Sequence, residues 1–307
     1  MNKKIYIGIV LFLLSYLQFL LPNNLIFAEI LTIFWFLFML GIILISDGLT
    51  QSIKHKSLLY VVLMNKKNFF SFIIISAIGA LLLDGVAQWL GKLWIYPYFN
   101  FYFYFVFFFF GFSFYWLMIA ESYLAVKAII DYLKKGKQIV QRTFRFEQRL
   151  YNILGVIGVI LILLSLILIF NDYLNQGGYI FDISKNTGYK VNFLIIIMIF
   201  VGIWFVFEYI EYKYKKTSLL KDIIHHYPTP LVSILVASFL LALVMEIENL
   251  YHGFWVYTNW PLEEIRFLNL PVIMLLAWPL HYVGFLSLFR AFTEKESDEI
   301  WRGDLIK

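Results

Sequence analysis

Long apolar stretches recur along the whole chain and constrain its fold more than any other feature. A helix that crosses the hydrocarbon core of a bilayer needs about 20 mostly apolar residues. Eight stretches reach that length, at about 5–21, 25–46, 69–90, 101–126, 150–170, 191–212, 230–250 and 268–290. Of the 307 residues, 62% are hydrophobic and 15% charged, whereas soluble domains have about 25% charged residues. The sequence therefore predicts an all-α, polytopic membrane protein and excludes a soluble enzyme or a disordered chain.

The chain contains no cysteine, and its five histidines are scattered. The missing thiols exclude cysteine catalysis, Cys-ligated zinc and iron–sulfur clusters. The adjacent pair His225 and His226 is too small a group to predict a metal site. We therefore expect neither a metal nor a cofactor. The first stretch follows Lys3 and Lys4 without a small-residue cleavage site, which favours a retained anchor.

The basic residues are distributed unevenly between alternate connections. With the N-terminus inside, 21 of the 25 Lys and Arg residues fall on the inner side, and only Lys92, Lys185, Lys190 and Arg266 fall outside. Inner loops of membrane proteins carry this excess, so both termini are predicted inside, in the cytoplasmic membrane of a prokaryote. The net charge of +5 then reflects loops beside anionic lipid, not nucleic-acid binding. We expect the cluster at 127–149 to be such a solvated loop.

The two halves of the chain resemble each other at offsets of 161 and 162 residues. The matched positions are Gly41 with Gly202, Asp47 with Glu208, Lys54 with Lys215, Ser57 with Ser218, Asp84 with Glu246, Trp94 with Trp255, Tyr96 with Tyr257 and Trp116 with Trp278. Residues 1–149 and 150–307 are therefore predicted to be two four-helix repeats. Because four is even, the repeats share one orientation and are related by an axis along the membrane normal.

Asp84 and Glu246 are the main candidates for catalysis. Ionisable groups at membrane depth are costly and mark functional sites, and these two acids occupy matched positions at the outer ends of spans three and seven. A carboxylic acid that keeps its proton in a dry pocket is a usable general acid. The alternative is a pair of helix-end carboxylates in water.

Polar and aromatic side chains near these acids are candidates for substrate binding. Aromatic faces stabilise a carbocation without supplying a nucleophile; the alternatives are an interfacial aromatic belt and ordinary helix packing. Asn249 and Gln88 are each placed to hydrogen-bond the acid one helical turn away. Glu121 is expected to pair with an inner basic residue, whereas Glu29 has no evident partner. The candidates are Trp94, Tyr96, Trp116, Glu248, Asn249, Trp255, Tyr257, Trp278 and His281.

The segment from Glu246 to Tyr257, with its acidic residues, Asn249, Gly253, Trp255 and Tyr257, resembles a motif of the membrane-integral lycopene cyclases. The stretch 270–279 is similar to a segment of the membrane carotenoid hydratases. The cyclases carry two glutamates shortly after a proline at the start of the next span. Here Val272 to Met274 follow the corresponding Pro271, and a Pro-Leu-Glu-Glu string stands ten residues earlier, at 261–264.

This resemblance, which covers about a quarter of the chain, implies an enzyme that modifies a carotenoid-like lipid. We expect an acid to protonate an alkene of a polyisoprenoid within the membrane, followed by ring closure or by addition of water. The partner is then a hydrophobic lipid. The alternatives are a transporter or flippase of a lipid or small hydrophobic molecule, and a non-catalytic scaffold. Substrate, product and oligomeric state stay open.

Overall fold

The computed structural model describes residues 2–22, 27–64, 66–134, 146–176, 190–214, 218–268 and 270–292. In this part of the chain, eight helices are long and apolar enough to cross a membrane, one at each predicted stretch. The elements are α1 Lys3–Ser15, η1 Tyr16–Leu20, α2 Ala28–Lys54, α3 Leu58–Leu63, α4 Lys66–Gly79, η3 Ala80–Leu90, β1 Trp94–Ile95, α5 Phe101–Leu133, α6 Glu147–Gln176, α7 Phe193–Lys213, α8 Leu219–Ile224, α9 Thr229–Asn249, β2 Val256–Tyr257, β3 Arg266–Phe267, β4 Leu270–Pro271 and α10 Met274–Phe292.

The helices follow from local sequence signals. The phenylalanine-rich run at 101–110 lies in the helix α5, which begins where the Asn100 side chain accepts a hydrogen bond from the backbone N–H of Phe103. Ser57 and Ser218 cap the short helices α3 and α8 in the same way, as N-terminal serines typically do. The eighth span begins at Met274 and not at 268, because Arg266–Phe267 and Leu270–Pro271 pair as the antiparallel strands β3 and β4.

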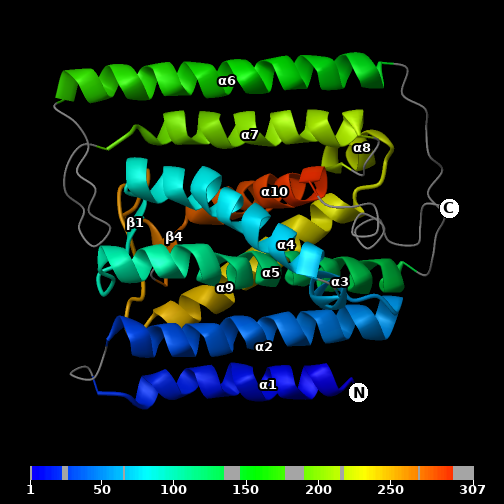
Figure 1. Cartoon of the computed structure of the whole chain (residues 1–307), viewed down its shortest axis with the longest axis vertical. Helices are drawn as coiled ribbons and strands as arrows, with labels where there is room; N and C mark the ends of the chain where they lie inside the picture. Colours follow the sequence, from blue (N-terminus) through cyan, green and yellow to red (C-terminus); the bar gives the residue numbers. More distant parts are fainter. Residues whose placement is uncertain are drawn as a thin grey trace.

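The long helices are ordered symmetrically across the molecule. In Figure 1 they run α6, α7, α10 from one edge and α1, α2, α5 from the other, with α4 and α9 near the middle. Close contacts join each outer pair. A Cβ added to Gly41 would lie 2.8 Å from the backbone of α1, and one added to Gly158 would lie 2.8 Å from the carbonyl of Gly202. Small residues let membrane helices approach this closely.

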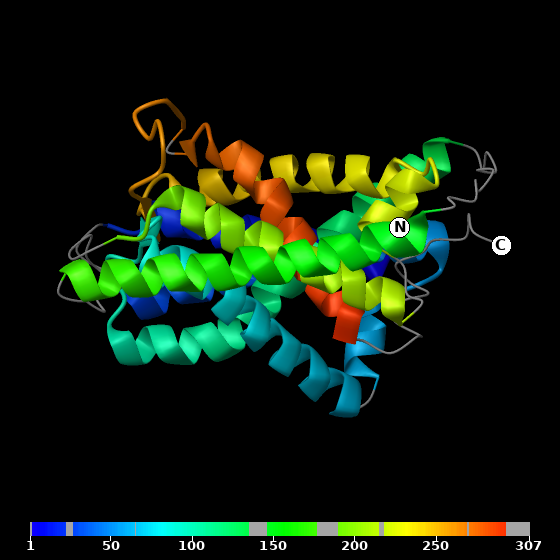
Figure 2. The ribbon, with the colours of Figure 1, turned by 90° about the horizontal axis from the view of Figure 1, so that it is seen from above.

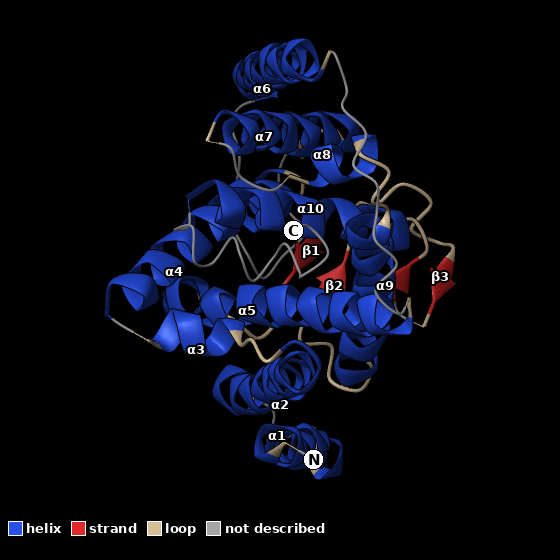
Figure 3. Ribbon diagram, turned by 90° about the vertical axis from the view of Figure 1, so that its right-hand side faces the viewer, coloured by secondary structure: helices blue, strands red, loops and turns tan. Residues whose placement is uncertain are grey.

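The two ends of the bundle differ. The strands β1 and β2 pair antiparallel, with Trp94 opposite Tyr257 and Ile95 opposite Val256, and they lie at one end of the bundle, the strand end. The helices α3 and α8 lie at the other, the short-helix end, where α1 also begins (Figures 1 and 3). Viewed from above in Figure 2, the segment after β2 projects at the strand end.

Buried ion pairs fill the short-helix end. Asp131 accepts from Lys127 at 3.0 Å and from the Tyr227 hydroxyl at 3.1 Å, and Lys54 lies 3.4 Å from it. The expectation that the basic cluster at 127–149 is a solvated loop is therefore wrong for Lys127, which is buried because α5 continues to Leu133. Most of that cluster, with Lys185 and Lys215, lies outside the described residues.

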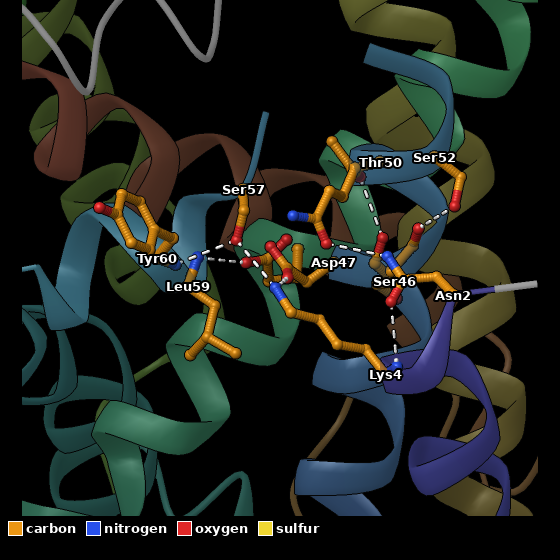
Figure 4. A network of polar contacts seen from close by, with 12 residues as sticks. Asn2, Lys4, Ser46, Asp47, Thr50, Ser52, Ser57, Leu59 and Tyr60 are labelled. Carbon is orange, nitrogen blue, oxygen red and sulfur yellow. Dashed lines mark hydrogen bonds and ion pairs between the residues drawn. The ribbon is translucent and has the colours of Figure 1, made fainter. Parts of the chain in front are cut away.

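A second polar network joins α1, α2, α3 and α5 (Figure 4). Lys4 forms an ion pair with Asp47 and reaches Ser57 at 3.3 Å. Glu121 does not follow the expected pairing with a basic residue, because its carboxylate accepts the backbone N–H of Leu59 at 2.9 Å. These contacts join four helices at the short-helix end, and the cavity described next lies toward the strand end.

Candidate active site

A cavity of about 80 Å³ lies toward the strand end, between elements of both halves of the chain. Its described lining is mostly aromatic and apolar and includes no lysine or arginine. Seven of the residues singled out in the sequence line it: Asp84, Trp94, Tyr96, Trp255, Tyr257, Trp278 and His281.

Asp84 supplies the cavity with a carboxyl group from the π-helical turn η3. Within α-helices, π-helical geometry occurs frequently at functional sites. The Asp84 side chain is almost fully buried, and its Oδ2 lies 3.5 Å from Nε2 of His281 on α10. This distance permits an ion pair when the imidazole is protonated.

Tyr115 on α5 completes a line of three polar side chains. Its hydroxyl lies 3.3 Å from Nδ1 of His281, so the imidazole stands between the phenol and Asp84. Tyr115 also lines the cavity. Sequence reasoning missed it, because a tyrosine in a phenylalanine-rich helix carries no signal that distinguishes it from its neighbours. Only packing against α10 reveals its partner.

Indole rings surround this line. Trp116 packs edge-on against His281 with centroids 4.8 Å apart and stacks on Phe285 at 4.2 Å. It therefore supports the imidazole, although it is not among the lining residues. Nε1 of Trp278 is buried and makes no hydrogen bond among the described residues, and Oδ2 of Asp84 and Nε2 of His281 have only each other, at 3.5 Å.

The strands β1 and β2 bring two tyrosine–tryptophan pairs to the cavity. Residues two apart on a strand share a face, so Tyr96 lies beside Trp94, and Tyr257 beside Trp255. Each tyrosine side chain lies close to its neighbouring tryptophan. Burial raises the pKa of Tyr96 and of Tyr257 well above the usual range. Both phenols therefore stay neutral and contribute π-faces and hydroxyls but no charge.

Glu246 is buried but is not among the residues of the cavity wall. Its carboxylate adjoins the Tyr257 side chain and lies 3.4 Å from the Asn249 amide, which agrees with the predicted Glu246–Asn249 contact. The Asn249 side chain also makes two hydrogen bonds with the backbone of Trp255. Its NH2 group donates to the Trp255 carbonyl at 2.9 Å, and its Oδ1 accepts from the Trp255 N–H at 3.0 Å. The expectation that both acids face one cavity is met only by Asp84, because Tyr257 lies between Glu246 and the cavity.

Glu248 and Gln88 differ from their predicted roles. Glu248 accepts from Gln18 at 2.6 Å and ties α9 to η1, away from the cavity. Gln88 does not bond Asp84, because its carbonyl accepts from the Tyr104 hydroxyl at 3.5 Å.

The remaining polar candidates lie at the surface of the bundle. His225 pairs with Glu147 at 3.2 Å, and Glu29 is exposed in the first turn of α2. No group of three or more metal-binding side chains occurs in the described ranges. These residues therefore add no second polar centre to the cavity.

The chain matches no family model, no curated protein and no solved structure. The function of the site is therefore inferred from its geometry. A carboxyl, an imidazole and a phenol stand in line, surrounded by aromatic faces and apolar side chains. Such a set can pass a proton along the line and can stabilise a cation beside it.

Proposed function

We propose that this chain is an intramembrane enzyme that protonates a carbon–carbon double bond of a polyisoprenoid, such as a carotenoid-like lipid. The observation that carries the proposal is the buried carboxyl of Asp84 in line with His281 and Tyr115, in an aromatic cavity whose described lining includes no lysine or arginine. The apolar wall suits a hydrocarbon substrate, and the resemblance to lycopene cyclases and carotenoid hydratases points to the same class of lipid.

The chemistry balances without a cofactor. The alkene π pair forms a new C–H bond with the proton of Asp84, which leaves a carboxylate and a tertiary carbocation. A neighbouring double bond then donates its π pair to close a ring, or a water oxygen adds. The proton lost in the last step returns to the carboxylate, and His281 is placed to relay it. The net reaction is an isomerisation or the addition of one water molecule. Trp278 and the tyrosine faces stabilise the cation.

We further infer that the two halves, 1–149 and 150–307, are parallel repeats. The pairing of β1 with β2 supports this, because Ile95 stands opposite Val256, its own counterpart at the offset of 161. A twofold axis between these two residues brings Trp94 opposite Tyr257, the counterpart of Tyr96. The elements also follow one another in a similar order: two long helices, a short helix, a long helix, a strand and a long helix. The second half adds the strands β3 and β4 before its last helix.

The charge distribution supports placing the strand end outside the cell. Lys92 precedes β1, Arg266 lies in β3, and Lys190 donates a hydrogen bond to Asn259 after β2. Lys4 and Lys54 lie at the short-helix end. The positive-inside rule then places the N-terminus in the cytoplasm. The cavity lies toward the outer leaflet in this orientation.

Expression in a lycopene-producing host, followed by pigment and lipid analysis, tests the proposal. We expect a new product that is an isomer of a host polyisoprenoid or heavier by one water molecule, and we expect it to be absent with Asp84→Asn. An unchanged pigment and lipid composition in cells that contain the folded protein would contradict the enzyme hypothesis. A lipid moved between leaflets without chemical change would support the transporter.

A further inference from the structure

The cavity wall is uneven in its exposure. Most lining side chains are buried. Five are only half-buried: Tyr115 of α5, and a group of four formed by Phe193, Ile197 and Phe200 of α7 with Ala277 of α10. The three α7 residues recur at helical spacing and therefore share one face. This exposed part of the wall is called the α7 side below.

Contacts tie α7 to neighbouring elements at both ends of the α7 side. At the strand end, Phe193 packs on Trp260 at 5.4 Å, and the backbone N–H of Val191 donates to Leu90 at 2.9 Å. At the short-helix end, Phe207 packs on Phe292 at 5.9 Å. The helix rises by about 1.5 Å per residue, so these contacts stand roughly 20 Å apart. Ile197 and Phe200 lie between them on α7.

The matched side in the first half is filled by aromatic rings. At the offset of 161, Ile197 corresponds to Phe36, whose ring lies 5.1 Å from Phe114 and 6.2 Å from Phe107. The neighbouring Trp35, which corresponds to Ile196, stacks on Phe254 at 5.6 Å.

On α10, the counterparts of these rings are again smaller side chains. At the offset of 162, Phe114 and Tyr115 correspond to Leu276 and Ala277. At these positions the second half has aliphatic side chains where the first half has rings. On the same face of α7, Phe193 and Phe200 stand where the first half has Thr32 and Met39.

We propose that the α7 side is a lateral portal, through which an apolar chain dissolved in the bilayer enters the cavity while the rest of that chain stays in the lipid. Residues 193–207 of α7 contain no charged side chain, and the flanking Leu194 and Leu276 are 68% and 74% exposed, as lipid-facing residues are. An ion or sugar finds no polar path there. That the entering chain is the substrate rests on the proposed function. That the cavity opens to the bilayer does not depend on it.

The absence of cysteine allows a direct test in liposomes. Ala87→Cys places one thiol in the buried cavity wall, and N-(1-pyrenyl)maleimide serves as a bilayer-soluble probe. We expect this probe to label the thiol faster than a charged, membrane-impermeant maleimide does. Adding Ile197→Trp narrows the portal and should slow labelling about tenfold, a barrier increase of about 1.4 kcal/mol.

Two controls keep the test specific. Leu194→Trp adds the same ring on α7 outside the cavity wall, and Phe36→Trp enlarges the ring on the filled side; neither should slow labelling. Thermal unfolding in detergent checks folding, and Phe200→Trp replaces Ile197→Trp if that variant fails to fold. Equal slowing by Leu194→Trp, no slowing by either portal variant, or faster labelling by the charged reagent would overturn the portal.

Labelling requires no turnover, so Asp84→Asn should be labelled like the parent cysteine variant. An inactive enzyme with portal-dependent labelling would contradict the proposed function alone. An active enzyme whose labelling ignores the portal variants would contradict the portal alone.

Discussion

Asp84 and Glu246 occupy matched positions, yet their surroundings differ. Asp84 faces His281 and the cavity, whereas Glu246 faces Asn249 and Tyr257. At the offset of 162, the position that corresponds to His281 is Ile119, so only one half has an imidazole to relay a proton. A symmetric pair of acids in the sequence has thus become one candidate acid and one supporting residue.

Replacing each acid by its amide separates these roles. Asp84→Asn should lower turnover by about 10²–10⁴-fold, the usual contribution of a general acid. Glu246→Gln preserves the side-chain volume and its contacts with Asn249 and Tyr257, so most turnover should remain, although the sequence alone predicts loss for both. Product formation per folded protein is the measurement. Equal losses in the two variants would show that both carboxyls act in the reaction.

In both halves, a glycine lets two neighbouring helices pack with their backbones in contact. Gly41 meets the backbone of α1, and Gly202 meets the carbonyl of Gly158. We expect Gly41→Ala and Gly202→Ala each to reduce the free energy of unfolding by about 1–3 kcal/mol, because a backbone contact cannot move aside as a side chain can. Thermal unfolding in detergent measures this. Gly284→Ala, which meets only the side chain of Leu83 at 3.2 Å, should cost less.

The short helix α8 carries a titrating group outside the spans. Burial raises the pKa of Asp222 from 3.8 to about 7, although the charges of Arg290 and Lys127 oppose the rise. The folded state thus binds this proton more tightly than the unfolded state. Its contribution to stability is fully present below about pH 4 and is lost as the pH rises to about 7. Between pH 5 and 8 the unfolding temperature of the parent should therefore fall more than that of Asp222→Asn. An identical fall in both would contradict this account.

At the scale of the whole molecule, the orientation in the membrane remains a prediction that reporter fusions can check. A fusion after residue 137 should report the cytoplasm, and one near residue 180 the outside, because the basic residues concentrate on the side of the first site. Both sites lie outside the described residues. The reverse pattern would move the strand end and its cavity to the cytoplasmic side.

The sequence by itself determined the eight membrane helices and the candidate residues near the strand end. Backbone groups in lipid must bond within their own segment, so apolarity and length suffice to predict helices. Cap residues such as Ser57 and Asn100 mark local boundaries for the same reason, since their partners are near in sequence.

Only the tertiary structure decided which residues meet. Apolar helices look alike on every face, so the pattern does not show which face turns toward which neighbour. Tyr115 and Asp84 come from different helices and are linked by His281. Glu248 accepts a hydrogen bond from Gln18 and does not line the cavity. These contacts depend on helix rotation and tilt. Side-chain packing across the whole bundle sets both, and no local signal in the chain encodes them.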